Sequence, residues 1–355
     1  MITNLTLKNW RCYSDASFDF GQTTVILGPN GVGKTNIIEA IYYLSTARSF
    51  RTIHDKDLIK AKAPFAQISS GPVQITIVDG LKIQKQLKVH QKPARMLQIL
   101  GVQPSVLFTP ESMALANGSP SLRRLFMDVV LSQTDLVYAR QLIEYQRALR
   151  QRNLLLHQIK LGTSSTESLK MWDELLVTCA IPIVLARKKF VNQMAGINQY
   201  YRQISQSAGE LSVNYLCSIE RHGAVVETEA ALTSRFHQRL IDRRVAEMQS
   251  ARTLVGPHRD DLEILLDQNL LATFGSRGQM RTAVVALKLF EFEYMKSQSD
   301  RVPTLLFDDV FSEFDLTHRR QMLDLALGAQ IIFTATDLSG LGELGKEVKI
   351  INLGA

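Results

Sequence analysis

The chain has 355 residues, an apolar content of 45%, a formal net charge of +7 and a sequence pI near 9.3. This length predicts two lobes, and the longest apolar stretch, residues 175–186, is too short to span a bilayer. The N-terminus lacks a signal-peptide pattern, and three scattered cysteines argue against a disulfide framework or a zinc cluster. We therefore expect a soluble, reduced, cytoplasmic protein. The positive charge fits ordinary solubility and a polyanionic partner about equally.

The first hundred residues have the pattern of β-strands. Apolar residues alternate at Leu5 and Leu7, and residues 23–27 form a β-branched run that ends at a glycine. Alternation resumes on both sides of Asp79-Gly80, which predicts a hairpin because glycine accepts the positive φ of a tight turn. A further short strand is expected at residues 106–108.

The periodicity then becomes helical. Ser119 is a suitable N-cap, and Pro120 suits the first turn of the helix that follows. Apolar residues spaced three and four apart between residues 138 and 197, interrupted by a polar loop at 162–167, predict a helical hairpin. Each arm should be roughly 40 Å long at 1.5 Å per residue. A third helix is expected at about residues 227–250.

Strand character returns near residues 262–266, 304–307 and 331–333. The sheet lobe is therefore expected to be discontinuous in sequence. We predict an α/β fold in which residues 1–110 and 251–355 form a head lobe and residues 111–250 form an inserted helical lobe with a short antiparallel hairpin.

A glycine-rich loop follows the strand at 23–27 and precedes a helix. It fits the P-loop pattern with the residues Gly28, Pro29, Asn30, Gly31, Val32, Gly33, Lys34 and Thr35. Such a loop curls so that its amide groups and the helix N-terminus face phosphate oxygens. We expect Lys34 to contact the β- and γ-phosphates and Thr35 to bind magnesium.

Two acids end the apolar strand at 304–307. Carboxylates at this position need a cation or a proton to be tolerated. Magnesium held between Asp308 and Thr35 would meet that need, and Asp309 could then orient an attacking water as general base. Lys34, Asp308 and Asp309 are thus the predicted catalytic residues.

Upstream of these acids, a second glycine-containing segment begins a helix. Its residues Ser276, Gly278 and Gln279 match the signature motif of ABC-type ATPases, and in their order relative to the acids the resemblance is specific. In that superfamily the signature contacts the γ-phosphate held by the P-loop of the opposite subunit. Ser312 and Asp315 resemble the D-loop that crosses the same interface. The resemblance thus implies an ABC-type P-loop ATPase head.

Nearly the whole chain resembles the RecF family of bacterial recombination and gap-repair proteins. The resemblance is carried by the following segments in order: residues 5–11, 35–41, 47–52 and 108–111, the Arg123-Arg124 pair with Asp128, and residues 151–153. The most distinctive string of this resemblance is Gly256-Pro257-His258-Arg259-Asp260-Asp261. The histidine and the acids could indicate a metal site, but we favour a structural turn near the nucleotide or the subunit interface.

The resemblance implies an ATP-dependent homodimer that uses ATP and Mg²⁺ and binds DNA, both double-stranded DNA and its junctions with single strands. It also implies work with the partners RecR and RecO to load a recombinase on gapped DNA. Arg277 stands where ABC signatures usually have glycine, Asp309 replaces the glutamate common in transporters, and no histidine follows the strand at 331–333. We therefore expect slow hydrolysis that acts as a timer.

Candidate DNA contacts are basic residues in three groups. They are Lys82, Lys85 and Lys88 in the hairpin, the cluster Arg187, Lys188 and Lys189, and Arg235, Arg239 and Arg243 at helical spacing. Each group could equally be a solvated basic face. Because no sequence-reading helix is evident, binding should follow backbone and shape.

Three other functions use a P-loop. A nucleotide kinase would need an acceptor pocket and an arginine-rich lid but neither a signature nor a D-loop. An ABC transporter subunit is disfavoured by the missing histidine and the helical insertion. The Rad50/SMC group inserts a coiled coil of hundreds of residues, which the short hairpin here does not provide.

Overall fold

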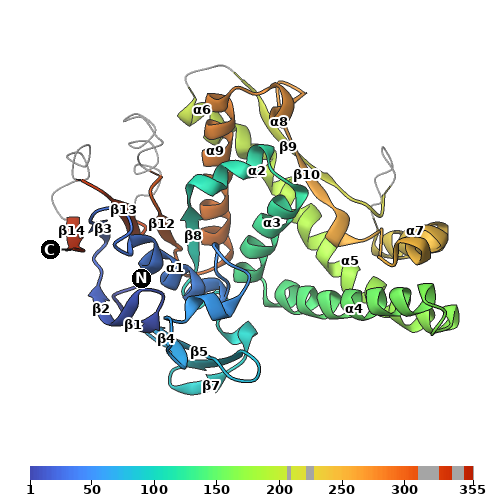
Figure 1. Ribbon diagram of the computed structural model, residues 1–355. Helices are drawn as coiled ribbons and strands as arrows, with labels where there is room; N and C mark the ends of the chain where they lie inside the picture. The colour runs from blue at the N-terminus through green and yellow to red at the C-terminus, as the bar shows by residue number, and fades with distance from the viewer. Residues whose placement is uncertain (206–208, 221–227, 311–327, 338–347, 355) are drawn as a thin grey trace. The chain divides into compact units, whose positions relative to one another are not determined.

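The computed structural model describes residues 1–205, 209–220, 228–310, 328–337 and 348–354 (Figure 1). The chain divides into two compact units. The first comprises Met1–Met113, Arg202–Gln206 and Val284–Ala355, and the second comprises Ala114–Tyr201 and Ser207–Ala283. Residues 251–283, which the sequence analysis assigns to the head lobe, therefore lie in the second unit.

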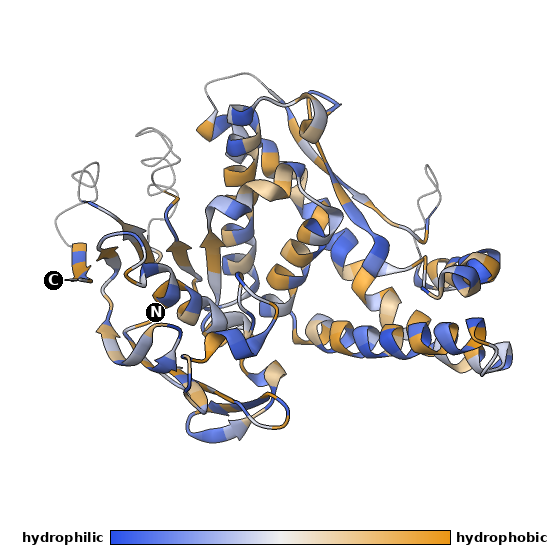
Figure 2. Ribbon diagram, viewed as in Figure 1, coloured by the Kyte–Doolittle hydropathy of each residue, from blue (hydrophilic) through white to orange (hydrophobic). Residues whose placement is uncertain are grey.

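A parallel sheet forms one layer of the first unit. Its strand order is β14-β3-β13-β12-β8. The strands are β3 (Thr23–Leu27), β8 (Ser105–Phe108), β12 (Thr304–Phe307), β13 (Ile331–Ala335) and β14 (Val348–Asn352). Figure 2 shows β8, β12 and β13 as hydrophobic along their length, and every residue of β8 and β12 is buried. Strands with both faces covered are apolar throughout, as parallel sheets require.

An antiparallel sheet forms the other layer of this unit, in the order β2-β1-β4-β5-β6-β7. Its strands are β1 (Asn4–Trp10), β2 (Tyr13–Asp19), β4 (Phe65–Ser70), β5 (Val73–Val78), β6 (Gln84–Val89) and β7 (Lys92–Ala94). The predicted hairpin is β5 and β6, paired from Val73 with Val89 to Val78 with Gln84.

Helix α1 (Lys34–Thr46) lies between the two sheets. Its residues Ile37, Ile38 and Ile41 share one hydrophobic core with Leu5 and Leu7 of β1 and with residues of β12 and β13. Every residue from 37 to 47 is buried. A helix covered on all sides is apolar all round, which accounts for the dense isoleucine and leucine content after the P-loop.

The second unit is mostly helical and carries its own small sheet. Its helices are α2 (Ala114–Asn117), α3 (Pro120–Thr134), α4 (Leu136–Lys160), α5 (Leu169–Gln193), α7 (Glu229–Ser250) and α8 (Leu271–Phe274). The predicted hairpin is α4 and α5, which have 25 residues each and pack together. Helices α6 (Ile197–Ile204) and α9 (Arg277–Gln298) each cross the boundary between the units.

The small sheet has the order β11-β10-β9, with β9 (Leu211–Leu216), β10 (Asp261–Leu266) and β11 (Asn269–Leu270). The sequence analysis assigns the strand at 262–266 to the head lobe, and this is wrong because β10 pairs with β9 along its whole length. None of the helices that the structure describes is long and apolar enough to cross a membrane.

A buried arginine joins α4, α5 and α7 of the second unit. Arg152 of α4 is fully buried and binds Asp173 of α5 at 2.7 Å, Glu247 of α7 at 2.6 Å and the Thr253 hydroxyl at 2.8 Å. Both carboxylates are also buried. A second arginine, Arg244, donates to the other oxygen of Asp173 at 2.7 Å. One guanidinium therefore ties three helices together and satisfies the polar groups that they bury.

Replacing this arginine should leave the buried carboxylate of Glu247 without its cation and Asp173 with Arg244 alone. We expect Arg152→Met to lower the free energy of unfolding by about 3–5 kcal/mol, the range for breaking a buried ion pair from one side. The neighbouring exposed Arg150 provides the control, and Arg150→Met should stay within about 0.5 kcal/mol. Denaturant titrations measure both, and equal values for the two variants would contradict the proposed fastening.

Candidate nucleotide-binding site

The glycine-rich loop at residues 28–35 connects β3 to α1. Its last glycine, Gly33, has φ of 112° and sits at the N-cap of α1. A β-carbon at Gly33 would lie 2.8 Å from the Cys12 sulfur and 2.8 Å from the Tyr13 hydroxyl oxygen. A β-carbon at Gly28 would lie 2.5 Å from the carbonyl oxygen of Leu353. The two glycines are therefore required by backbone conformation and by close packing of the loop against β2 and the end of β14.

Lys34 lies within the curve of this loop. Its ammonium donates to the carbonyl oxygens of Gly28 at 2.6 Å and Pro29 at 3.0 Å. The side chain is buried, and it is among the residues that line a cavity next to the loop. The loop thus holds a cation where a phosphate group at the helix N-terminus would lie.

The acid at the end of β12 meets the residue that follows Lys34. Asp308 is 6% exposed, and its Oδ1 accepts hydrogen bonds from the Thr35 hydroxyl at 3.0 Å and the Thr334 hydroxyl at 3.1 Å. Burial raises the pKa of Asp308, while the hydroxyls of Thr35 and Thr334 oppose that shift and the neighbouring Asp309 adds to it. No ion-pair partner of Asp308 is found among the residues that the structure describes.

The donor set at this point suits a magnesium ion. A carboxylate and a hydroxyl, both hard oxygen ligands, lie within hydrogen-bonding distance at the edge of the cavity. A buried carboxylate without a cationic partner also gains from a divalent cation. Asp308 and Thr35 are therefore the residues that fit Mg²⁺.

Asp309 follows in the left-handed conformation, with φ of 53°. Its backbone amide donates to the Thr334 hydroxyl oxygen at 2.8 Å, and its exposed side chain lines the cavity. A non-glycine residue in this conformation is held there by its surroundings. The bond to Thr334 directs Asp308 and Asp309 to different parts of the site.

The cavity has a volume of about 300 Å³, and the sequence analysis missed three of the residues that line it. Thr334 is near the end of β13, which lies between β3 and β12, so the carboxyl ends of these parallel strands meet at one edge. Arg51 donates to the Asn36 side chain at 2.9 Å, and both residues line the cavity. Strand order, which the sequence does not state, would have been needed to find Thr334.

The signature residues form the start of α9 in the second unit. The Ser276 amide donates to the Gln279 side chain at 2.8 Å, and the Gln279 amide donates to the Ser276 hydroxyl at 3.2 Å. This reciprocal pattern is a capping box. Ser276, Arg277 and Gly278 are exposed, so the segment remains accessible to a partner. The predicted D-loop residues Ser312 and Asp315 lie outside the described residues.

The predicted DNA contact Arg187 is wrong because its charge is used inside the protein, whereas Lys85 is half-exposed and forms an ion pair with Asp55. Arg187 is 2% exposed and binds Asp128 at 2.7 Å and the Pro257 carbonyl at 2.6 Å. Lys85 lies on the face of β6 that packs inward, where it pairs with Asp55 at 2.9 Å. Strand alternation places Lys88 on the opposite face.

The other predicted DNA contacts differ in how accessible they are. Lys188 pairs with Glu220 at 2.5 Å. The exposed members are Lys82, Lys189 and Arg243, while Lys88, Arg235 and Arg239 are half-buried. Both of the triads predicted on the second unit, residues 187–189 and residues 235, 239 and 243, therefore contain only one exposed cation each.

Comparison with known proteins gives matches over almost the whole chain. The family model of the RecF/RecN/SMC N terminal domain matches residues 1–339. The DNA replication and repair protein RecF of Chloroflexus aggregans is 36% identical over 369 residues, covering 95% of this chain and 94% of its own length. The protein of the same name from Geobacillus kaustophilus is 36% identical over 353 residues, covering 96% and 94%.

Two solved structures are similar in fold to this chain over almost its whole length. A structure described as the recombination mediator protein RecF-ATPrS in the RecFOR pathway is 28% identical, with a TM-score of 0.88 over 99% of this chain and 96% of its own. The Smc head domain of Pyrococcus furiosus, solved with an extended coiled coil and bound to the C-terminal domain of ScpA, is 16% identical with a TM-score of 0.52 over 99% and 93%. The fold is thus that of an ABC-type ATPase head, as the sequence predicts.

The packing of the loop can be tested with two alanine substitutions. Gly31→Ala meets no atom within 4 Å, so it should cost only the strain of its positive φ of 83°, about 1–2 kcal/mol. Gly33→Ala adds contacts of 2.8 Å with Cys12 and Tyr13 and should lower the free energy of unfolding by more than Gly31→Ala does. Denaturant unfolding measures the difference. Equal costs would show that the loop does not pack against residues 12 and 13.

Proposed function

The chain belongs to the RecF family, and from this membership we propose that it is an ATP-dependent DNA-binding protein that acts in recombinational repair of gapped DNA and in replication restart. The observation that carries the proposal is the contact between Thr35 and Asp308, whose side chains meet at 3.0 Å although 273 residues separate them. This contact joins the phosphate loop to an acidic strand end, which is the arrangement a nucleotide and its metal ion require.

We propose that this chain's own residues divide the work at the nucleotide as follows. The amides of the loop and the Lys34 ammonium bind the phosphates, and Thr35 and Asp308 hold Mg²⁺. When bound, the metal would supply charge neutralisation for the transferring phosphoryl group. Asp309, on the cavity side of the strand end, orients the attacking water and accepts its proton.

Hydrolysis is proposed to be slow. Thr334, in the carboxyl-terminal half of β13, is occupied in accepting from the Asp309 amide and donating to Asp308. The side chain of Asp309 is also one methylene shorter than the glutamate of ABC transporters. Its backbone is held in the left-handed conformation, with φ of 53°, which limits how far the carboxylate can reach toward the nucleotide. ATP binding would then set how long the protein stays on DNA, and hydrolysis would act as a timer.

DNA binding is proposed for duplexes and for duplex–single-strand junctions. The solved neighbour named for the RecFOR pathway supports work with RecO and RecR. The exposed residues Lys82, Lys189 and Arg243 remain as phosphate contacts, together with the half-buried Lys88 of the hairpin. We propose that the first unit serves as the ATPase head lobe and the second as the helical lobe.

Two substitutions separate nucleotide binding from hydrolysis. Lys34→Met removes a cation that faces the phosphates and should weaken ATP binding by roughly 1.5–3 kcal/mol. Asp309→Asn keeps the shape of the site but removes the base, so it should bind ATP with unchanged affinity and lose about a hundredfold or more in turnover. Equilibrium binding of a fluorescent ATP analogue and release of phosphate measure the two effects. Normal turnover by Asp309→Asn would exclude this residue as the base.

Dimerisation on ATP is the sharpest test of the proposed function. Two copies related by a two-fold axis would bring Ser276 of each to the phosphates bound by the other, so a bulky cation there should prevent closure. Ser276→Arg should bind ATP and remain a monomer in light scattering with a slowly hydrolysed analogue, whereas the unaltered chain should dimerise.

Two controls complete this test. Ser276→Ala loses the helix cap without adding bulk, and Ser297→Arg adds the same side chain at an exposed position near the other end of α9. Both should still dimerise with the analogue. Dimerisation by Ser276→Arg would exclude the proposed contact in trans.

A further inference from the structure

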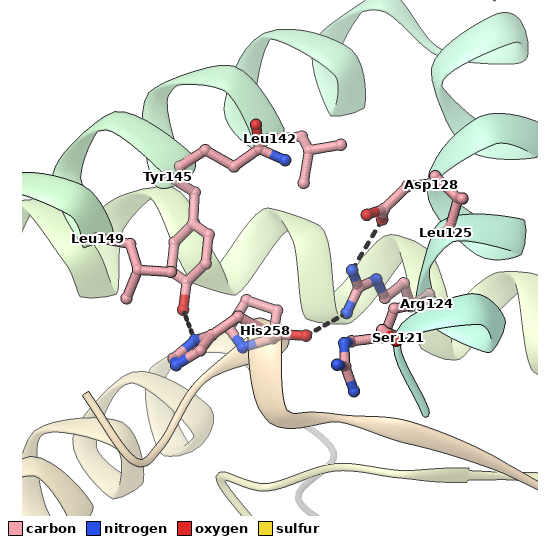
Figure 3. A pocket seen from close by; sticks show the side chains of 11 residues that line it. Ser121, Arg124, Leu125, Asp128, Leu142, Tyr145, Leu149 and His258 are labelled. Carbon is pink, nitrogen blue, oxygen red and sulfur yellow. Dashed lines mark hydrogen bonds and ion pairs between the residues drawn. The ribbon is translucent and has the colours of Figure 1, made fainter. Parts of the chain in front are cut away.

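A second cavity, of about 300 Å³, lies wholly within the second unit and away from the phosphate loop in sequence (Figure 3). It is open to solvent and lined by α3, α4, α5 and the short 3-10 helix η6 (Pro257–Arg259). The lining residues are Ser121, Arg124, Leu125, Asp128, Leu142, Tyr145, Gln146, Leu149, Arg187, Pro257 and His258. This volume is at the small end of ligand sites and suits one or two side chains of a partner.

Most of the polar groups in this cavity are already paired. Arg187 donates to Asp128 and to the Pro257 carbonyl, and Asp128 also accepts the hydroxyl of Tyr138. His258 meets the Tyr145 hydroxyl at 2.6 Å through Nδ1 and the Thr253 carbonyl at 3.0 Å through Nε2. Burial lowers the pKa of His258 to about 4, so its ring is neutral at physiological pH. The charges of Arg187 and Asp128 are therefore paired with each other, and His258 carries no charge to offer a ligand.

Arg124 is different. Within the described part of the chain its guanidinium donates one hydrogen bond, to a neutral acceptor, the backbone carbonyl of Asp260, at 2.7 Å. Among the described residues no carboxylate lies within ion-pair distance of its guanidinium. Burial and the nearby Arg187 lower the pKa of Arg124, while Asp261, Asp260 and Asp128, all beyond ion-pair distance, oppose that shift. The neighbouring Arg123 shows the contrast, because it forms two parallel bonds to Asp261 at 2.7 and 2.8 Å.

Three leucines line the cavity together with Tyr145 and Gln146. Leu142 and Leu149 lie seven residues apart on one face of α4, and Leu125 of α3 is 42% exposed. Figure 3 shows Leu142 and Leu149 along one helix, with Arg124 and His258 across the cavity from them. The cavity therefore presents leucine side chains from both α3 and α4 and one partly desolvated cation, Arg124.

We propose that this cavity docks an acidic segment of a partner protein, with an apolar side chain against Leu125, Leu142 and Leu149 and an adjacent carboxylate paired with Arg124. An apolar anchor in a pocket beside a charged rim is the usual form of an interface hot spot. The leucines favour a protein over a nucleic acid, because a phosphate backbone has no aliphatic side chain to pack against them and the one aromatic residue in the lining, Tyr145, has its hydroxyl bonded to His258.

A random heptapeptide library displayed on phage, selected on the full immobilised chain, tests the proposal. Enriched peptides should share an apolar residue next to Asp or Glu. Their affinity, measured by fluorescence polarisation, should fall roughly tenfold or more with Arg124→Gln, the loss expected for a charged hydrogen bond. Leu125→Ser should also weaken binding. Arg140→Gln, the same change at an exposed position of α4, should not.

A second measurement needs no protein variant. Replacing the acid of an enriched peptide by its amide should weaken binding to the unaltered chain by a similar factor, even if Arg124→Gln folds poorly. The proposal is overturned if no peptide is enriched, if enriched peptides lack an acid, or if the amide peptide binds equally well. A labelled 30-base-pair duplex should bind Arg124→Gln as tightly as the unaltered chain. Loss of duplex binding without peptide enrichment would assign the cavity to nucleic acid instead.

Discussion

Helix α1 has no free face, because a parallel sheet covers one side of it and an antiparallel sheet covers the other. A helix so enclosed cannot shift along its axis without disturbing both layers, since packed interiors tolerate little change in volume. Its first turn carries Lys34 and Thr35, so the packing of α1 in the core also sets the position of the phosphate loop. Asp308 reaches Thr35 only because β12 packs in the sheet beneath the same helix. The geometry of the site thus depends on the burial of α1.

The parts of this site that could be predicted are those with local sequence signals. A glycine-rich loop between a strand and a helix, and an apolar strand that ends in acids, are each complete within a few residues. Thr334 was missed because its role depends on β13 lying between β3 and β12. Arg187 was misread for a related reason: a basic residue has the same sequence signal whether its partner is a phosphate or a carboxylate of the protein itself, such as Asp128. The pairing of β10 with β9 likewise depends on a contact that residue patterns do not specify.

The two units are stabilised in different ways. The first relies on continuous apolar packing around α1. The second buries arginines between its helices, with Arg152 binding carboxylates of α5 and α7 and Arg187 binding Asp128 of α3. Buried ion pairs contribute little net stability but penalise every arrangement that separates them. This polar interior fixes how the helices are registered, which matters for a unit that carries the signature segment at Ser276.

The parallel sheet also constrains when the protein can fold. Strand β3, made at residues 23–27, pairs only with β13 and β14 among the described strands, and these lie at residues 331–335 and 348–352. More than three hundred residues must therefore be synthesised before β3 finds a neighbour, and α1 has no parallel sheet to cover it until then. Contacts so distant in sequence form slowly, and apolar strands that wait for partners are prone to aggregate. Nascent chains of this protein should accordingly depend on chaperones until β13 and β14 have been synthesised.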